Sequence, residues 1–467
     1  MHTFAKQSIS KLLLLILTLS VILSSLSSCI KPKYVAESKD EIRENIAASQ
    51  LDGEKPNGNV YDYLYGWGMP TFDRIKFSYY EAIVNMYYNY AAVPNAKEHA
   101  TKTALAFLDE YYDDIDLQSK AIVTDALLSC YVSTLGDPYA IYRIAEATDD
   151  YQTDMSGKFG GIGVMIEYDH INETVMISMV YPGSPAERAG IMVGDFIYAV
   201  DGETVNDIGY LKAVDRVRGK IGTSVNITLL RDGKQIDVSA VRDEVEEINV
   251  SYSINEEKNI GYVQIVAFKG NTAEQFKNAI DTLEAAGVSG IIFDLRGNPG
   301  GYVDSVVDVI SYLVPNGNDI VSFKYKNSPK TTLKSKNDGS GDHVIKIPVV
   351  VLANEYTASS GEIFTSAIRD YRNDRLLKAT IVGTTTFKKG IMQSTFAYAI
   401  DGSTVTMTVA YYDPPCGVNY HGIGITPDVY VELPEPVLDT ETGKYLPVED
   451  TQLDRAVLEL QKLINAN

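Results

Sequence analysis

The chain has 467 residues, and at roughly 100 to 200 residues per domain this length excludes a single small module. Hydrophobic residues make up 45% and charged residues 22%, a balance that excludes wholesale disorder and a polytopic membrane protein. Asp and Glu number 62 against 41 Lys and Arg, a formal net charge of -21, so nucleic acid is a poor candidate partner.

The first 28 residues have the layout of a secretory signal peptide. Lys6 and Lys11 precede an apolar run at 12–23, which is shorter than the roughly 20 residues of a membrane-spanning helix, the weaker alternative. Leu26-Ser-Ser-Cys29 resembles a bacterial lipobox, which implies a lipid on Cys29. We therefore expect an exported protein, anchored by that lipid to the extracytoplasmic side of the membrane in a bacterial cell envelope. Ordinary signal cleavage beside an incidental cysteine is the alternative.

Residues 29–71 are polar and rich in turn formers, and we interpret them as the lipidated Cys29 followed by a flexible tether. Residues 72–142 show helical spacing of apolar side chains and many tyrosines, which predicts helix up to residue 142. We assign residues 72–155 to an N-terminal helical segment whose tyrosines pack between helices or at an oligomer surface. Cys130 falls within that helical pattern and is expected in the core; pairing of Cys130 with Cys416 is not predicted, although nothing in the sequence excludes it.

Residues 156–245 alternate short apolar runs with Gly, Asp and Pro turns, which predicts a small β-rich domain. Near its start, Gly160-Gly-Ile-Gly-Val164 leads into an apolar strand, and glycines there allow consecutive N–H groups to face one anion. A nucleotide phosphate loop is excluded, because no Gly-Lys-Ser/Thr and no helix follows. The candidate carboxylate-binding residues are Gly161, Ile162, Gly163 and Val164.

Residues 246–435 alternate strands and helices, which predicts an α/β core with parallel pairing in a mixed sheet. The expected strands are 260–266, 290–295 and 347–353, and the expected helices are 272–286, 302–314 and 360–371. Residues 436–467 form a C-terminal tail with a final helix at 453–464. The predicted fold class is therefore a multidomain α+β protein.

Two strand ends in this core carry residues suited to acyl transfer. The strand at 290–295 runs into Arg296-Gly-Asn-Pro-Gly-Gly301, where adjacent glycines can present backbone donors to an oxyanion. The strand at 347–353 runs into Ser359-Ser360 at the N-terminus of a helix, where unpaired N–H groups favour negative charge. Taken alone, these serines fit a helix N-cap, with Glu362 completing a capping box.

A third element changes this interpretation. Phe387-Lys388-Lys389-Gly390 follows a strand at 380–383, and the three elements in this order resemble the C-terminal processing (tail-specific) peptidases. Leu135-Gly-Asp-Pro-Tyr139 and Gly422-Ile-Gly-Ile-Thr-Pro-Asp428 add to the resemblance, which extends over residues 127–431. That family consists of Ser-Lys serine proteases with an inserted PDZ domain, and the Pro-Gly-Ser-Pro-Ala to Gly194-Asp195 spacing of the β-rich domain resembles a PDZ domain.

The resemblance assigns a role to each candidate. It implies that Ser359 is the nucleophile, Lys389 the general base and Gln393 the residue that orients the lysine, with the amides of Gly301 and Ser360 as the oxyanion hole. Such a lysine must lose its proton to act as a base, so we expect its pKa to lie below the ordinary 10.4 or so. The PDZ loop at 161–164 would bind the C-terminal carboxylate of an extended peptide or gate the active site.

The chain departs from the family pattern in three places. The usual Ser-Ala-Ser-Ala-Ser-Glu is Thr357-Ala-Ser-Ser-Gly-Glu362, so Ser360 is a rival to Ser359. The usual Phe-Gly-Lys-Gly carries Lys388 in place of its first glycine, and this ammonium either tunes Lys389 or faces solvent. A polar insertion at 373–377 lengthens the segment between serine and lysine, which an exposed loop would absorb.

Two other functions compete with a Ser-Lys protease. A Ser-His-Asp hydrolase would need one of His99, His170, His343 or His421, and none has a convincing sequence setting. An inactive, surface-anchored PDZ peptide-binding protein would not need Ser359 and Lys389 together. We expect protein substrates with accessible apolar C-termini, a homodimer through the helical segment, and no metal or organic cofactor.

Overall fold

The structure, a computed structural model, describes residues 73–88, 120–169, 174–336, 343–434 and 448–466. It forms two compact units, and each is considered by itself. Unit 1 takes its described residues from Met1–Asp149, Phe323–Thr331 and Ile391–Tyr412, and unit 2 from the rest of the chain. The predicted signal peptide, Cys29 and tether lie outside the described residues, so they stay predictions.

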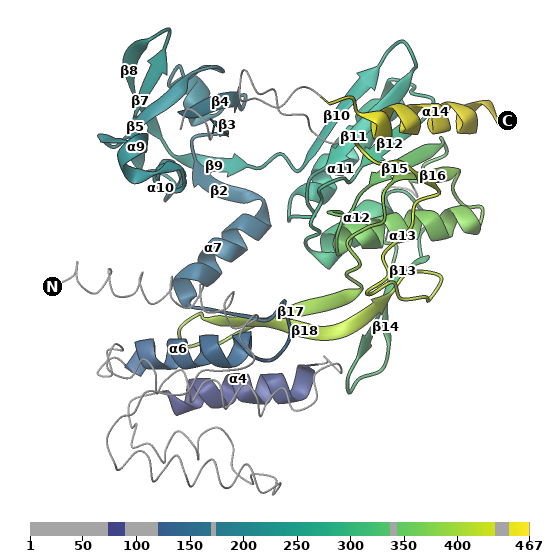
Figure 1. The fold of residues 1–467 in the computed structure, drawn as a ribbon, viewed down its shortest axis with the longest axis horizontal. Coiled ribbons are helices and arrows are strands. Elements are labelled where there is room, and N and C mark those ends of the chain that lie inside the picture. Colours follow the sequence, from purple (N-terminus) through teal and green to yellow (C-terminus); the bar gives the residue numbers. More distant parts are fainter. Residues whose placement is uncertain (1–72, 89–119, 170–173, 337–342, 435–447, 467) are drawn as a thin grey trace, which may run out of the picture. The chain divides into compact units, whose positions relative to one another are not determined.

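Unit 1 contains the N-terminal helical segment that the sequence predicts (Figure 1). Its helices are α4 (Arg74–Tyr87) and α6 (Lys120–Ser133), and several of the tyrosines pack in its interior as expected. The side chains of Tyr80 and Tyr131 are fully buried, and the Tyr80 hydroxyl donates to the Ser403 carbonyl at 2.6 Å. The role of this segment in dimerisation stays a prediction.

The segment expected to be helical also contains a strand. Residues 141–143 form β1 (Ile141–Arg143), which pairs antiparallel with β18 (Thr404–Asp413), and β17 (Ile391–Ala397) pairs antiparallel with β18 as well. Helix α7 (Ala145–Ser156) follows β1. The expectation of helix up to residue 142 was wrong there because β1 is held by a partner more than 250 positions away, which helical spacing cannot reveal.

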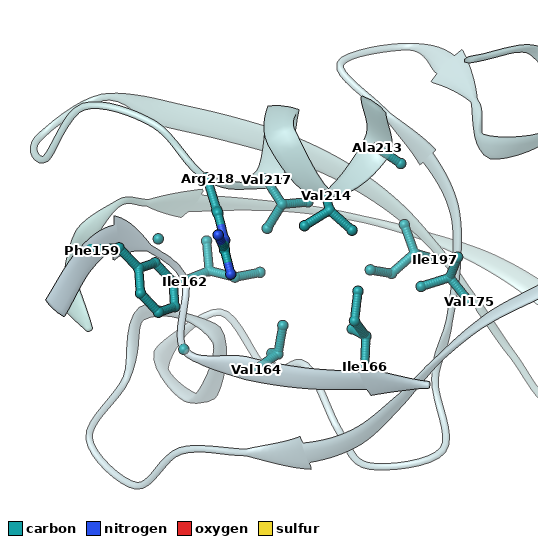
Figure 2. Close-up of a pocket in the computed structure, with 12 residues that line it drawn as sticks. Phe159, Ile162, Val164, Ile166, Val175, Ile197, Ala213, Val214, Val217 and Arg218 are labelled. Carbon is teal, nitrogen blue, oxygen red and sulfur yellow. The ribbon is translucent and has the colours of Figure 1, made fainter. Parts of the chain in front are cut away.

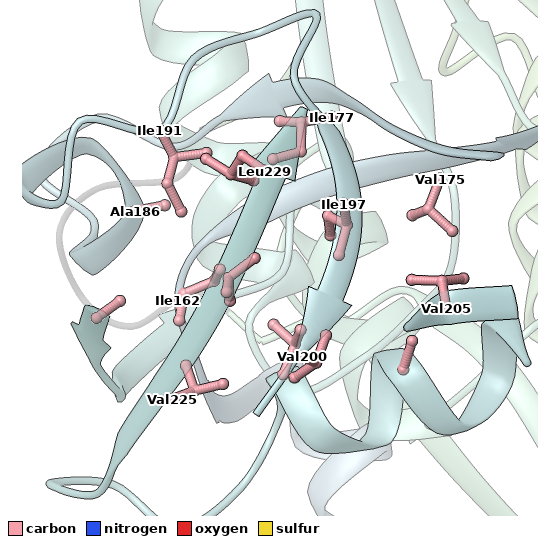
Figure 3. Close-up of a cluster of buried hydrophobic side chains, with 14 residues drawn as sticks. Ile162, Val175, Ile177, Ala186, Ile191, Ile197, Val200, Val205, Val225 and Leu229 are labelled. Atoms are coloured by element: carbon pink, nitrogen blue, oxygen red, sulfur yellow. The ribbon is translucent and has the colours of Figure 1, made fainter. Parts of the chain in front are cut away.

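The β-rich domain of unit 2 is built as the sequence predicts. Its main sheet has the order β3-β4-β5-β7-β8 with antiparallel neighbours, and the short β6 pairs with β5. One buried apolar cluster fills the interior of this domain (Figure 3). It consists of alternate side chains from the strands, of Ala186, Ile191 and Val205, and of Ala213 and Val217 from helix α10. The elements are β2 (Lys158–Gly161), β3 (Val164–Asp169), β4 (Thr174–Val180), α8 (Pro185–Arg188), β5 (Phe196–Val200), β6 (Glu203–Thr204), α9 (Val205–Ile208), α10 (Tyr210–Val217), β7 (Ser224–Arg231), β8 (Lys234–Val241) and β9 (Asp243–Glu246), the last of which pairs with β2.

The α/β core of unit 2 has a mixed sheet in the order β10-β11-β12-β15-β16-β19. Neighbouring strands from β11 to β19 are parallel and β10 is antiparallel, which confirms the predicted mixed sheet with parallel pairing. The strands are β10 (Val250–Asn255), β11 (Ile260–Ile265), β12 (Ile291–Asp294), β15 (Val349–Ala353), β16 (Ala379–Gly383) and β19 (Val429–Tyr430).

Helices cover both faces of this sheet (Figure 1). On one face, Ile292, Val350 and Val382 pack against Ala456 and Leu460 of the C-terminal helix. On the other face, the ring of Phe293 contacts the rings of Phe276 and Phe364 at centroid distances of 5.6 Å. Successive side chains of a strand point to opposite faces of the sheet. Because helices bury both faces, nearly every residue of these strands is apolar, which explains the near-continuous apolar runs of the sequence. The helices are α11 (Thr272–Ala285), α12 (Val303–Ser311), α13 (Ser360–Asn373) and α14 (Thr451–Asn465).

The remaining strands, β13 (Asp319–Tyr325) and β14 (Thr331–Lys334), lie between α12 and β15 in the chain. Neither was predicted from the sequence. Cys130 is buried and Cys416 is exposed, and both are free thiols. No helix within the described residues is long and apolar enough to cross a bilayer.

Candidate active site

Ser359 lies in a strained turn between β15 and α13. Its backbone has φ 53° and ψ -116°, in a region that favours glycine and costs a residue with a side chain roughly 1–3 kcal/mol. The residue is half-buried. A serine at a sharp strand-to-helix turn is presented at the carboxyl end of a parallel sheet, the edge at which α/β folds bind ligands.

The neighbouring serine has a different setting. Ser360 is fully buried, and its Oγ donates a hydrogen bond to the Gly301 carbonyl at 2.9 Å. Its hydroxyl is therefore used to join the helix start to the glycine loop. Of the two rival serines, Ser359 has the exposure and the backbone conformation that suit a nucleophile.

Main-chain and side-chain hydrogen bonds hold the Ser359 turn in place. The Ala358 N–H donates to the Asn298 carbonyl at 2.8 Å, and the Thr357 Oγ1 donates to the Leu295 carbonyl at 2.8 Å. The Phe387 N–H donates to the Thr357 carbonyl at 3.0 Å. The turn is thus tied both to the loop after β12 and to the segment that carries Lys389, which explains how the strain is maintained.

The glycine loop at 296–301 is organised by Asn298, which is fully buried. The Asn298 Oδ1 accepts the Gly300 N–H at 2.8 Å, and its Nδ2 donates to the Ile265 carbonyl at 2.8 Å. Both glycines are required by close contacts: a Cβ on Gly300 would lie 2.7 Å from the Ser359 Cβ, and a Cβ on Gly301 would lie 2.2 Å from the Phe268 carbonyl oxygen. The glycines therefore let this loop approach the serine turn closely.

Among the residues that the structure describes, none accepts a hydrogen bond from the amides of Gly301 and Ser360 beside the serine turn. The parallel bridge between Phe268 and Gly301 uses the Gly300 carbonyl and the Tyr302 N–H, so it leaves the Gly301 N–H unused. In the first turn of α13, the Gly361 N–H donates to the Ala358 carbonyl and the Glu362 N–H donates to the Ser359 carbonyl, both at 2.8 Å. Neither bond uses the Ser360 N–H. The Ser360 N–H lies at the positive end of that helix. These two amides are the donors that the sequence predicted for an oxyanion.

One buried carboxylate connects the serine turn with the lysine segment. The Glu362 Oε2 accepts the N–H of Ser359 at 3.1 Å and the N–H of Lys389 at 2.8 Å. The Glu362 Oε1 accepts the Lys388 N–H at 2.8 Å and the Thr386 hydroxyl at 2.6 Å. Burial raises the pKa of Glu362, although these four donors oppose that shift.

The lysine segment follows β16. Lys389 is half-buried, whereas Lys388 is exposed, so the second ammonium faces solvent. Lys388 has φ 82°, a conformation for which glycine is best suited, and this explains why a glycine is usual at its position in the family motif. The polar insertion at 373–377 begins at the last residue of α13 and continues through an exposed turn at 374–376, whereas Leu377 is buried.

The histidine alternatives gain no support within the described residues. The His421 Nδ1 accepts the Gly390 N–H at 3.3 Å, and burial lowers the His421 pKa, which favours a neutral structural ring. His343 stacks on the Tyr312 ring with a centroid distance of 3.9 Å and its Nε2 lies 2.9 Å from a Glu284 oxygen. His99 and His170 lie outside the described residues.

Gln393, the predicted lysine-orienting residue, belongs to unit 1. It lies on β17 at a register shift, and its Nε2 donates to the Thr408 hydroxyl at 3.1 Å. Its role toward Lys389 stays a prediction.

A pocket in the β-rich domain contains the predicted carboxylate-binding loop. Gly161, Ile162, Gly163 and Val164 all line it, and aliphatic side chains from β3, β4, β5 and α10 form the rest of its wall (Figure 2). Arg218 lies at the end of the pocket beside Phe159, with its guanidinium carbon 4.6 Å from the ring centroid. The pocket therefore combines a glycine loop, an apolar wall and one cation.

Sequence reasoning missed three contributors to these sites. Asn298 lies inside the quoted glycine motif, but its role depends on partners at residues 265 and 358. Glu362 was interpreted as part of a capping box, and the structure adds its bonds to the lysine segment. Arg218 follows helix α10 and was not singled out. No group of three His, Cys, Asp or Glu side chains suited to a metal occurs in the part of the chain that the structure describes.

Comparison with known proteins agrees with this geometry. A model of peptidase family S41 matches residues 259–431, and a PDZ domain model matches residues 176–231. The carboxy-terminal processing protease CtpA of Bacillus subtilis (strain 168) is 36% identical over 71% of this chain and 69% of its own length. A CtpA-like serine protease of Staphylococcus haemolyticus (strain JCSC1435) is 34% identical over 72% of this chain and 64% of its own length.

A solved structure has the same fold. A structure assigned as an S41 protease from Bacteroides fragilis NCTC 9343 aligns over 82% of this chain and 97% of its own, with a TM-score of 0.50 and 17% identity. The family matches and the fold are those of a serine-type peptidase with a PDZ domain. The chain belongs to peptidase family S41, among its CtpA-like carboxy-terminal processing proteases.

Proposed function

We propose that the chain is an exported, lipid-anchored serine endopeptidase that binds the C-terminal tails of proteins and cuts them with Ser359 and Lys389. The observation that carries the proposal is the pair of bonds at the Glu362 Oε2, which accepts the backbone N–H of both residues. A strained, half-buried serine and a half-buried lysine are thereby fixed to one buried atom.

The proposed reaction is a two-step acyl transfer. The neutral amine of Lys389 takes the proton of the Ser359 hydroxyl as the Oγ attacks the scissile carbonyl, and the N–H groups of Gly301 and Ser360 bind the developing oxyanion. The resulting ammonium protonates the leaving amine, and an acyl-enzyme remains on Ser359. A water then attacks the ester with Lys389 as base, which releases the acid and restores the serine. Gln393 is proposed to orient the lysine.

The substrate class follows from the pocket of the PDZ domain. A C-terminal carboxylate would bind the N–H groups of the loop at 161–164 and the guanidinium of Arg218. The last side chain of the tail would enter the aliphatic wall formed by residues such as Val175, Ile197 and Val217, so an apolar C-terminal residue is favoured. Peptide addition along a strand would extend the tail out of this pocket.

Export and anchoring complete the proposal. Residues 1–28 are proposed to direct secretion and Cys29 to carry the lipid, which would hold the enzyme on the extracytoplasmic face of a bacterial membrane. Cells that express the protein are grown with a radioactive fatty acid. Incorporation of the label into the protein, lost in a Cys29→Ala variant, would support the anchor. Labelling that persists in this variant would refute it.

The activity is tested with a loosely folded reporter protein that ends in either an apolar or an acidic tail. The full-length chain in detergent micelles, Ser359→Ala and Lys389→Ala are compared in parallel. Cleavage by the unsubstituted chain alone, with preference for the apolar tail, supports the proposal. If Ser359→Ala still cuts, the assigned nucleophile is wrong, and if the unsubstituted chain binds tail peptides without cutting any reporter, the protein is a peptide-binding protein instead.

A further inference from the structure

Arg296, the first residue of the glycine loop, is held between two carboxylates. Its Nη2 donates to the Asp294 Oδ2 at 2.6 Å, and its Nη1 and Nη2 donate to the two oxygens of Asp450 at 2.7 and 2.8 Å. Both carboxylates thus accept hydrogen bonds from the planar guanidinium of Arg296, and the contact with Asp450 is bidentate. The Arg296 side chain is only 15% exposed. Burial by itself would lower the pKa of Arg296, but the two carboxylates raise it, so the guanidinium stays charged.

Asp450 lies far along the chain, at the start of the C-terminal helix α14. Its Oδ1 also accepts the Leu453 N–H at 2.9 Å, so the same carboxylate caps the helix and binds Arg296. The helix itself is anchored independently of this contact. Ala456 and Leu460 are fully buried against the sheet, and a Cβ on Gly290 would lie 2.7 Å from the Leu460 Cδ1. Asp450 is therefore presented from a firmly packed element.

Arg296 is two residues from Asn298, which organises the oxyanion loop. The main chain of this short loop is also held by the Gly297 N–H, which donates to the Asn354 Oδ1 at 3.0 Å, by the Arg296 N–H, which donates to the Asp294 Oδ1 at 2.9 Å, and by the Asn298 N–H, which donates to the Leu295 carbonyl at 3.1 Å. Asn298 then fixes both the Gly300 N–H and the Ala358 N–H, each at 2.8 Å. A shift of Arg296 would therefore be transmitted through Asn298 to the Gly301 amide and to the Ser359 turn.

We propose that Asp450 is a positioning residue for the hydrolytic site: through Arg296, the C-terminal helix holds the loop that presents the Gly301 amide to the oxyanion. This inference rests on the proposed function, because it assigns the Gly301 amide a role in peptide hydrolysis. Asp450 touches neither Ser359 nor Lys389 in this arrangement, and its effect is exerted on the geometry of the loop.

The test is Asp450→Asn in the full-length chain in detergent micelles. Asn caps helices as well as Asp does and has nearly the same size. The substitution therefore removes the negative charge that binds Arg296 and preserves the N-cap of α14. Kinetic constants on the apolar-tailed reporter are measured together with the rate at which a fluorophosphonate labels Ser359. Both reactions need the same oxyanion donors.

Small displacements of catalytic groups cost up to about 100-fold in rate, so we expect an intermediate loss of about 10-fold in kcat and in the labelling rate. KM should stay within about twofold, since the PDZ pocket is untouched, and Asp450→Glu should recover part of the loss. Glu449→Gln, an exposed neighbour of the same charge, is the matched control and should behave as the unsubstituted chain.

The inference is overturned if Asp450→Asn retains kcat and the labelling rate within twofold, measured well below the thermal midpoint of every variant. A lowered melting temperature with unchanged kcat would show a purely structural role and would also overturn it. Should Asp450→Asn not fold, Asp450→Ser, which likewise caps the helix, takes its place. Failure of the unsubstituted chain to cleave and to be labelled would instead refute the proposed function, and this inference with it.

Discussion

Glu362 binds the segment of Lys389 from a distance of 27 positions in the chain: its Oε2 accepts the Lys389 N–H at 2.8 Å. The same atom accepts the N–H of Ser359, at 3.1 Å, and the Glu362 side chain is fully buried. A single carboxylate thus fixes the main chain beneath both proposed catalytic groups, without needing either side chain for the purpose.

Replacing Glu362 by Gln is expected to lower both stability and activity. Gln offers one acceptor oxygen in place of two and turns an NH₂ group toward N–H donors, so at least one buried donor loses its partner. Such a loss costs about 1–3 kcal/mol for a neutral donor, and a misplaced serine or lysine lowers kcat about 100-fold. Thermal unfolding and steady-state kinetics measure the two effects.

Glu355→Gln is the matched control, because Glu355 is an exposed carboxylate that accepts the Thr384 hydroxyl at 2.7 Å near the same turn. It should change neither quantity. A Glu362→Gln variant with kcat/KM within twofold of the unsubstituted chain would show that this carboxylate does not position the pair.

The two adjacent lysines are expected to respond very differently to substitution. Lys389→Met removes the proposed base and should lower kcat by at least about 100-fold, the lower range for general-base catalysis. Lys388→Gly should leave kcat unchanged and raise stability by up to about 1 kcal/mol, since glycine adopts φ 82° without strain. Turnover and thermal midpoints are measured on both variants. If Lys388→Gly lost turnover and Lys389→Met stayed active, Lys388 and not Lys389 would be the general base.

The PDZ pocket should recognise the charge of a tail through Arg218. In a Ser359→Ala background, which prevents cleavage, Arg218→Gln is expected to weaken binding of an apolar tail peptide about 10-fold, by analogy with other charge-assisted contacts. Fluorescence anisotropy measures the affinity, and Lys220→Gln, an exposed lysine two positions away, is the control.

A C-terminal amide on the peptide supplies a second comparison for Arg218. Amidation should weaken binding to the chain with Arg218 and have a smaller effect once Arg218 is replaced, because the two changes remove the same contact. Additive effects of the two changes would mean that Arg218 does not bind the carboxylate.

The PDZ domain should also lose stability in acid through Asp195. Hydrogen bonds from Arg231, at 2.6 and 2.7 Å, hold the pKa of the buried Asp195 below its usual value. A carboxyl whose folded pKa is lowered stabilises the fold above the unfolded pKa of about 3.9, and that stabilisation is lost as the pH falls below it.

Asp195→Asn should therefore be less stable than the unsubstituted chain at pH 7, by about 2 kcal/mol for the lost charged hydrogen bonds. The difference should shrink as the pH falls below about 3.9, the pKa of an unfolded Asp. This stability difference is measured by urea unfolding at several pH values, with the loss of tail-peptide binding as the signal for unfolding of the PDZ domain. A difference that does not change with pH would show that the charge on Asp195 does not contribute.

The core elements were predictable from the sequence because their apolar patterns are local. The run Ile291-Ile-Phe-Asp294 is buried on both sides, and helix α13 begins at Ser360 as predicted. Strands β1 and β18 were not predicted as a pair. Thr and apolar residues alternate along β18, but its partner β1 lies more than 250 positions earlier in the chain, so the pairing depends on tertiary structure.

The candidate site shows the same division. Ser359, Lys389 and the glycine motif came from residue types, their order and the family resemblance. The physical reason to prefer Ser359 over Ser360 came from the backbone conformation of Ser359 and the contact of Ser360 with Gly301. The dual role of Glu362 had no sequence signal beyond a capping box. Its partners in the lysine segment are 24 to 27 positions away.

The most direct measurement is the location of a covalent adduct. The full-length chain in detergent micelles is treated with a fluorophosphonate, and the modified residue is found by peptide mass spectrometry in the unsubstituted chain, Ser360→Ala and Lys389→Met. The proposed mechanism predicts an adduct on Ser359 in the unsubstituted chain and in Ser360→Ala, and a labelling rate at least about 100-fold lower in Lys389→Met. An adduct on Ser360, or equal labelling without Lys389, would contradict the Ser359–Lys389 assignment.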